Sequence, residues 1–290
     1  MPSIWRRAAA LARIVRPGNV LLTALSVFVG GVCAYAPWGA PLLVACASAA
    51  LIAAGGYAIN DVFDVEIDRV NRPDRPLPKG DLTAPMAAAW AALLVAAGVA
   101  LSFVLAWPAR AIACAAAASL VAYAARLKRV AIVGHVTVAS TSALAFPYGG
   151  LCGPEWYMAL VPAALAWAFH FGRELLKAAA DVEGDSVAGV DTAAARWGVR
   201  ATCRLAAIPL ALIVILSPVP AVKGWFGAPY LLMVVPGVDA VLVHVVRRAW
   251  SRPDAHTASQ LATLLKWDML AGLVAVGGDR WMSWLPVVGH

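Results

Sequence analysis

The chain has 290 residues, of which 62% are hydrophobic and 13% are charged, and its formal net charge is +7 at pH 7. Soluble globular domains typically carry about 25% charged and roughly 45–50% apolar residues. A chain this apolar has too little polar material to cover a surface in water, so the composition excludes an ordinary soluble domain. It predicts an all-α protein of the lipid bilayer, because helices satisfy their own backbone polar groups in hydrocarbon.

The predicted elements are helices that follow one another from the first residues onward. Residues 1–19 are basic and amphipathic and lack a small-residue cleavage site, which predicts a surface helix rather than a signal peptide. Apolar segments of roughly 20 residues, long enough to cross a bilayer, then recur along the rest of the chain. We predict about nine transmembrane helices, over residues 18–36, 41–60, 84–106, 109–126, 131–151, 157–177, 202–222, 228–247 and 258–276.

The positive charges are distributed as a signal of membrane topology. With nine crossings and a cytoplasmic N-terminus, all but three of the 23 Lys and Arg residues lie at the cytoplasmic side, and the exceptions are Arg110, Lys223 and Arg280. Cytoplasmic loops of membrane proteins carry such an excess of Lys and Arg. The charge therefore predicts an integral protein of the cell membrane with a cytoplasmic N-terminus, and it indicates no nucleic-acid partner.

Most of the 16 acidic residues fall in two windows that lie four predicted helices apart. The first window, residues 61–81, follows the second predicted span, and the second window, residues 174–191, follows the sixth. Both windows therefore face the same side of the membrane. Membrane proteins often build sites where internal repeats meet. We predict one domain over residues 1–290, with two four-helix halves at roughly 1–126 and 127–247 and one additional helix.

The spacing of the aspartates places them on shared helix faces. Asp61, Asp64 and Asp68 stand at positions i, i+3 and i+7, and Asp181 and Asp185 stand at i and i+4. Like charges at these spacings repel each other, and more strongly beside a membrane of low dielectric constant. A divalent cation would offset the repulsion, and Mg²⁺ prefers carboxylate oxygens and keeps positions for water and substrate phosphates. The two clusters therefore predict a Mg²⁺ site.

A proline-rich loop with basic residues follows the first cluster directly. Arg72, Arg75 and Lys79 lie on this loop, and arginine offers a planar fork that suits phosphate oxygens. Two acidic clusters that face each other, with Mg²⁺ and a basic loop, describe a site for a diphosphate. The alternative is that the aspartates are solvated loop residues and the basic residues only set topology. Because the sequence has two such patches, four spans apart, and the aspartates of each share a helix face, we favour the diphosphate site over solvated loop residues.

The two acidic motifs resemble those of the UbiA superfamily of intramembrane prenyltransferases. Its first motif, N-D-x-x-D-x-x-x-D, is matched by NDVFDVEID at residues 60–68, and its second, D-x-x-x-D, by DVEGD at residues 181–185. The resemblance implies a ring of nine transmembrane helices around a central cavity that opens laterally to lipid. It also implies Mg²⁺ as the cofactor, a polyprenyl diphosphate as the donor and a lipophilic acceptor.

The resemblance also implies roles for individual residues. The five aspartates would hold Mg²⁺ and act in catalysis, while Asn60 would orient the first set. Tyr123 would face the prenyl cation with its ring, or it only packs near the membrane interface. Asn19 would line the cavity. Candidates for contacts to the diphosphate are Arg72, Arg75, Lys79, Lys128 and Lys177.

Three functions are compatible with the sequence. The stretches at residues 60–80 and 172–185, the second including Arg173 and Lys177, look closest to digeranylgeranylglyceryl phosphate synthase-like members of the superfamily. This resemblance favours transfer of a prenyl group, best a geranylgeranyl group, to geranylgeranylglyceryl phosphate in ether-lipid synthesis. The second function is prenylation of an aromatic acceptor in a quinone, haem or chlorophyll pathway. The third is an ion-coupled transporter, which would place its carboxylates near the middle of the bilayer rather than at span ends.

Overall fold

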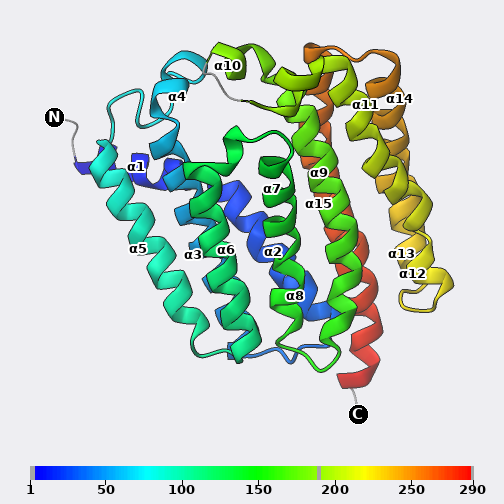
Figure 1. The fold of residues 1–290 in the computed structure, drawn as a ribbon. Coiled ribbons are helices and arrows are strands. Elements are labelled where there is room, and N and C mark those ends of the chain that lie inside the picture. The colour runs from blue at the N-terminus through cyan, green and yellow to red at the C-terminus, as the bar shows by residue number, and fades with distance from the viewer. Residues whose placement is uncertain (1–3, 188–190, 289–290) are drawn as a thin grey trace.

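The structure is a computed structural model that describes residues 4–187 and 191–288. The described residues form a bundle of helices, and none of them lies in a strand (Figure 1). This confirms the predicted all-α architecture. The helices are α1 (Ile4–Ile14), α2 (Pro17–Cys33), α3 (Ala40–Phe63), α4 (Val65–Asn71), α5 (Ala84–Ser102), α6 (Trp107–Ala125), α7 (Val133–Ala143), α8 (Ala145–Gly150), α9 (Leu160–Ala180), α10 (Val182–Val187), α11 (Ala193–Leu216), α12 (Val219–Val222), α13 (Ala228–Met233), α14 (Ala240–Ser251) and α15 (Ala255–Val288).

Three short helical segments of other types connect these α-helices. Two are 3₁₀ turns, η1 (Leu127–Arg129) before α7 and η2 (Trp156–Ala159) before α9. The third, η3 (Val234–Asp239), is a π-helical turn between α13 and α14, and π turns inside helices frequently mark functional positions.

Six described helical segments are long and apolar enough to cross a membrane, and the bent pair of α1 and α2 makes a seventh. The protein is therefore an integral membrane protein, whereas the number of nine spans stays a prediction. Each predicted range coincides with helical backbone, but two are not single long apolar helices. The range 131–151 is divided between α7 and α8, and the range 157–177 ends in a charged stretch that includes Arg173, Glu174 and Lys177.

Helix starts and breaks follow from local sequence. Proline occupies the first turn of α2, α3, α5 and α6, where its missing N–H costs no helical hydrogen bond. The helix that the first acidic motif predicts is not continuous, because α3 ends at Phe63 and Asp64 has φ −99° and ψ 5° before α4 begins. Asp181 has nearly the same conformation, φ −93° and ψ 6°, between α9 and α10. Each acidic motif therefore lies at a break between a long helix and a short one.

The first and last long helices are joined at the end of the bundle opposite α4 and α10 (Figure 1). Arg280 of α15 donates to the carbonyl oxygen of Cys33 at 3.2 Å and to the hydroxyl of Tyr35 at 2.8 Å. Its guanidinium also lies over the rings of Tyr35 and Phe226, at 4.7 and 5.3 Å from their centroids. These contacts, the Arg280 clamp below, fix the end of α15 against the end of α2.

The crossing of α2 and α8 requires glycine on both helices. A Cβ atom at Gly149 would lie 1.8 Å from the carbonyl oxygen of Val27, and one at Gly30 would lie 2.0 Å from that of Phe146. Such close approach of two backbones is characteristic of small residues at helix contacts in membranes.

Substitution of Gly149 by alanine should therefore force α2 and α8 apart. We expect the free energy of unfolding to fall by about 2 kcal/mol, as in other overpacked interiors, and thermal unfolding of the purified protein measures it. The matched control is Gly18→Ala at the start of α2, where a Cβ would meet no atom within 4 Å. A Gly149→Ala variant as stable as this control would contradict the close crossing.

Candidate functional site

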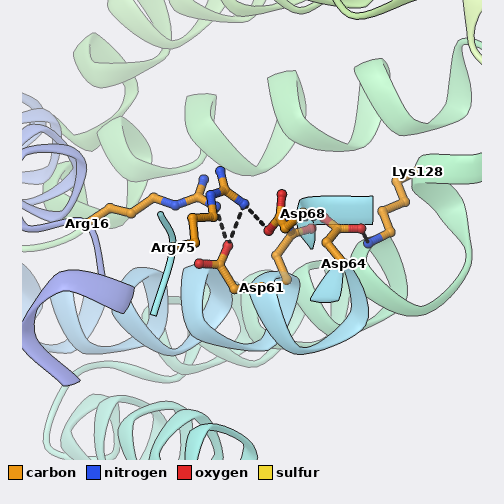
Figure 2. Close-up of polar contacts among 7 residues, drawn as sticks. Arg16, Asp61, Asp64, Asp68, Arg75 and Lys128 are labelled. Carbon is orange, nitrogen blue, oxygen red and sulfur yellow. Dashed lines mark hydrogen bonds and ion pairs between the residues drawn. The ribbon is translucent and has the colours of Figure 1, made fainter. Parts of the chain in front are cut away.

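The first acidic cluster lies where α3 ends and α4 begins. Asp61 on the last turn of α3 and Asp68 on α4 are only 4% and 5% exposed, and Asp64 lies at the break between the two helices. Figure 2 shows the three carboxylates side by side, with basic side chains reaching them from two directions. The predicted face is thus formed, although by two helices rather than one.

Each carboxylate of this cluster has a basic partner from another part of the chain. Arg75 donates to Asp61 at 3.1 Å and to Asp68 at 2.5 Å, so the proline-rich loop folds back over the cluster. Lys128 of η1 lies 2.5 Å from Asp64 (Figure 2). The amide of Asn60 also donates to Asp64, at 2.7 Å, and its role in orienting the cluster stays a prediction.

Arg16 is a partner that the sequence did not reveal. It lies at the bend between α1 and α2 in a left-handed conformation, with φ 54°. Its guanidinium pairs with Asp61 and lies 5.2 Å from the centroid of the Tyr57 ring. In the sequence Arg16 is one of the basic residues that indicate membrane topology. Its place directly before the proline that starts α2, three residues before Asn19, was the available signal.

The second acidic cluster faces the first. The short helix α10 contacts α4, and both lie at the same end of the bundle (Figure 1). Burial and repulsion from Asp181 raise the pKa of Asp185 to about 6, and the negative charge of Asp64 contributes to the rise. Burial also raises the pKa of Asp68, although the hydrogen bond and charge of Arg75 oppose this. The two motifs are therefore within electrostatic range of each other, and the end of the bundle that carries Asp61, Asp64, Asp68, Asp181 and Asp185 is called the mouth below.

A deeper layer of polar groups lies below this mouth. Glu174 of α9 is 7% exposed and pairs with Arg173 at 3.1 Å and with Lys177 at 3.5 Å. Tyr123 of α6 lies within electrostatic range of Glu174, Asp64, Asp185 and Arg16. This position supports the predicted place of Tyr123 in the site, and its role at the prenyl group stays a prediction.

Tyr57 of α3 lies in the same layer. Its hydroxyl lies near the side chain of Asn19, and Arg16 and Glu174 lie within electrostatic range. Asn19 therefore lies close to the site, and its role in lining a cavity stays a prediction. Tyr57 itself was missed, although it lies one turn before Asp61 on α3, and this spacing from the first acidic motif was the available signal.

Two predicted contact residues lie at the margin. Lys79 is exposed, and no side-chain contact in the described part of the chain joins it to an acidic residue. Arg72 is also exposed, but it lies within electrostatic range of Asp185. The geometry places Arg75 and Lys128 on the carboxylates, whereas Lys79 is not brought to them.

The donor chemistry of the mouth fits Mg²⁺. As the side chains stand, no group of three His, Cys, Asp or Glu residues in the described ranges is arranged to hold one ion. Mg²⁺ does not require such a group, since proteins commonly bind it through one or two carboxylates with substrate phosphates and water. Guanidinium and ammonium groups already lie on the oxygens of Asp61, Asp64 and Asp68, so these oxygens occupy positions that suit a cation.

Comparison with known proteins decides the family. The model of the UbiA prenyltransferase family matches residues 20–270. The chain belongs to the UbiA prenyltransferase family. It is accordingly a prenyltransferase, and the aspartates described above lie within the matched region.

Individual relatives in this family are also similar over nearly their whole length. A digeranylgeranylglyceryl phosphate synthase of Sulfurisphaera tokodaii is 37% identical over 271 residues, which cover 91% of this chain and 95% of the relative. A solved structure that concerns digeranylgeranylglyceryl phosphate synthase in membranes is 27% identical, with a TM-score of 0.79 and coverage of 94% and 98%. A UbiA homologue from Archaeoglobus fulgidus, solved bound to GPP and Mg²⁺, shares the fold with a TM-score of 0.70 at 18% identity, covering 92% and 99%.

The pairing of Arg75 with the carboxylates predicts a Mg²⁺-dependent change in stability. Arg75→Gln leaves Asp68 beside Asp61 and Asp64 without its partner, and breaking such a pair costs about 3 kcal/mol. We expect the Tm of the metal-free variant to fall, and added Mg²⁺ to raise it by more than it raises the wild type, because a cation then replaces the lost charge.

The matched control for this experiment is Arg69→Gln. Arg69 pairs with Glu66 at the surface, with side chains 60% and 73% exposed, so its loss should change neither Tm nor the Mg²⁺ response. Thermal unfolding of both variants with and without Mg²⁺ provides the comparison. An Arg75→Gln variant that behaves like Arg69→Gln would refute a cation site at these carboxylates.

Proposed function

We propose that this UbiA-family enzyme transfers a geranylgeranyl group from geranylgeranyl diphosphate to geranylgeranylglyceryl phosphate at the cytoplasmic face of the membrane. The observation that carries the proposal is the pair of acidic clusters facing each other across a mouth edged with basic residues. The curated relatives named digeranylgeranylglyceryl phosphate synthase, 34–38% identical to the chain, support this acceptor. The excess of Lys and Arg on the side of the mouth supports its cytoplasmic orientation.

Within this proposal the residues have different roles: the aspartates hold the metal and the basic residues contact the diphosphate. Asp61, Asp64 and Asp68 would hold Mg²⁺ from one side and Asp181 and Asp185 from the other, with Asn60 fixing the orientation of Asp64. Mg²⁺ supplies positive charge where negative charge develops on the leaving diphosphate. Arg75, Lys128 and Arg16 already lie at the carboxylates and would donate to the diphosphate oxygens, and the exposed Arg72 and Lys79 would meet the donor as it enters.

The reaction requires one bond to break and one to form. The allylic C–O bond of the donor breaks, with its electron pair leaving on the diphosphate, while an oxygen of the acceptor bonds to the allylic carbon and loses its proton to the released diphosphate. Tyr57 and Tyr123 would stabilise positive charge on the prenyl group with their rings. Arg173 and Lys177, which pair with Glu174, would bind the phosphate of the acceptor.

Two other functions were compatible with the sequence. Membership of a prenyltransferase family supports an enzyme over an ion-coupled transporter. An aromatic acceptor stays the second candidate for the same chemistry. The division into two pseudo-repeat halves, 1–126 and 127–247, also stays a prediction, supported by the matching breaks at Asp64 and Asp181.

Single substitutions in either acidic motif should abolish turnover. We expect Asp64→Ala and Asp181→Ala each to lower the rate by roughly a thousandfold, because stabilisation of the leaving group is the main catalytic contribution. The controls are Glu66→Ala and Glu183→Ala, whose exposed side chains point away from the motif faces. Release of labelled diphosphate measures the rate, and size-exclusion chromatography shows that each variant is folded. Full activity of Asp64→Ala, or of wild type in excess chelator, would remove the metal assignment.

A panel of acceptors tests the proposed substrate. Purified protein with Mg²⁺ and geranylgeranyl diphosphate is incubated separately with geranylgeranylglyceryl phosphate, a hydroxybenzoate and a porphyrin, and mass spectrometry identifies the products. We expect a product that carries a second geranylgeranyl chain on the glycerol phosphate. Prenylation of an aromatic compound alone would establish the second candidate instead.

A further inference from the structure

A group of arginines on the exposed faces of α11 and α14 takes no part in the proposed reaction. Arg200 and Arg204 are exposed near the start of α11, and Arg247 and Trp250 are exposed near the end of α14. The two helices lie side by side, and these ends are at the same end of the bundle as α4 and α10 (Figure 1). The guanidinium of Arg204 lies 5.2 Å from the centroid of the Trp250 ring, and Arg247 is one turn before Trp250 on the same helix face. Arg200, Arg204 and Arg247, with Trp250, are called the arginine patch below.

The positive charge of the arginine patch is not neutralised by a carboxylate in the described part of the chain. The acidic residues that lie nearest in sequence have other partners. Asp191 pairs with Arg196 at 2.7 Å. The two oxygens of Asp254 accept from the backbone N–H and the hydroxyl of Thr257, each at 2.8 Å. The arginines of the mouth, by contrast, are paired with aspartates. The arginine patch is therefore free to bind an anion from outside the chain.

An apolar stripe continues from the arginine patch along the same face of α11. Ile208, Leu212 and Ile215 are 60%, 47% and 70% exposed. They stand four, eight and eleven residues after Arg204, and residues at these spacings share one helix face. The helix rises roughly 16 Å from Arg204 to Ile215, half of a hydrocarbon core that is about 30 Å thick. The stripe therefore has the length of one membrane leaflet, with the arginines at its headgroup end.

Membrane topology alone would explain why these residues are basic, since one side of a membrane protein carries an excess of Lys and Arg. Topology requires no particular arrangement of the side chains, however. In this structure one arginine is stacked on an exposed tryptophan, two others flank it, and an apolar stripe follows on the same face. Clusters of basic residues at the ends of membrane spans are typical of binding to anionic lipids. The arrangement thus matches a molecule with an anionic head and an apolar chain.

We propose that the arginine patch binds the phosphate headgroup of an anionic membrane lipid whose acyl chain lies along the stripe on α11. Guanidinium groups bind phosphate oxygens through paired hydrogen bonds, and the ring of Trp250 holds Arg204 in place for this contact. A soluble anion would leave the apolar stripe unused, and the ammonium group of a zwitterionic lipid would be repelled by the arginines. The site lies on the outer surface of the bundle and does not depend on the identity of the prenyl acceptor.

The test measures the binding of two lipids that differ in headgroup charge. The full chain in non-ionic detergent is titrated with phosphatidylglycerol or with phosphatidylcholine of identical acyl chains, and native mass spectrometry counts the bound lipids. We expect the wild type to bind phosphatidylglycerol more tightly. In Arg204→Gln the apparent affinity for phosphatidylglycerol should fall roughly fivefold, the contribution of one basic residue at an anionic lipid surface. Binding of phosphatidylcholine should not change, which also shows that the variant is folded.

Two control variants separate the patch from net charge and from the diphosphate site. Arg69→Gln removes the same charge from α4 at the same end of the bundle and should bind both lipids as the wild type does. Asp64→Ala should lose turnover and keep the preference for phosphatidylglycerol, so failure of the catalytic proposal and failure of this one give different results.

A soluble competitor separates a lipid site from a simple anion site. Glycerol 3-phosphate carries the anionic group without acyl chains, and we expect it not to displace phosphatidylglycerol at equal concentration. Displacement would mean that the patch binds soluble anions. Equal losses in Arg204→Gln and Arg69→Gln would mean that total charge attracts the lipid. Either result, or equal binding of the two lipids by the wild type, overturns the proposal.

Discussion

The repulsion between closely spaced carboxylates at the membrane boundary is the constraint on which the site depends. Asp61, Asp64 and Asp68 cannot be buried together with their negative charges unless cations lie between them. In this structure the cations come from three separate parts of the chain: Arg16 before α2, Arg75 on the loop after α4, and Lys128 before α7. The need to neutralise one short motif thus explains why the loop after α4 folds back and why the bend before α2 lies against α3.

This arrangement also prepares the site for its substrates. In the proposed reaction the basic side chains that neutralise the carboxylates would turn to the diphosphate once a metal ion takes their place. Exchange of partners would then replace one set of ion pairs by another, so the protein's own charges would stay paired. The residues that stabilise the empty mouth, Arg75 and Lys128 above all, are therefore expected to be the residues that contact the donor.

Much of this architecture could be predicted from the sequence, because hydrophobic length and aspartate spacing are local properties. Each of the nine predicted ranges lies mostly in helix, although nine separate spans stay a prediction, and α4 and α10, which carry part of the two acidic motifs, contact each other at one end of the bundle. The break at Asp64 could not be predicted, since it depends on how α4 packs. Tyr57 lies one turn before Asp61 but was missed, because in the sequence an aromatic residue of an apolar helix is not distinguished from a packing residue. Lys79 was expected at the carboxylates only because it is near in sequence, and the turn after Arg75 carries it outward.

The Arg280 clamp restricts the route by which lipophilic molecules could reach the interior of the helix bundle. It joins α15 to the end of α2, at the end of the bundle opposite the aspartates. A lipid tail that passes laterally between α2 and α15 would therefore enter on the aspartate side of the Arg280 clamp. Molecules that enter there would come from the membrane leaflet at the same end of the bundle as the aspartates.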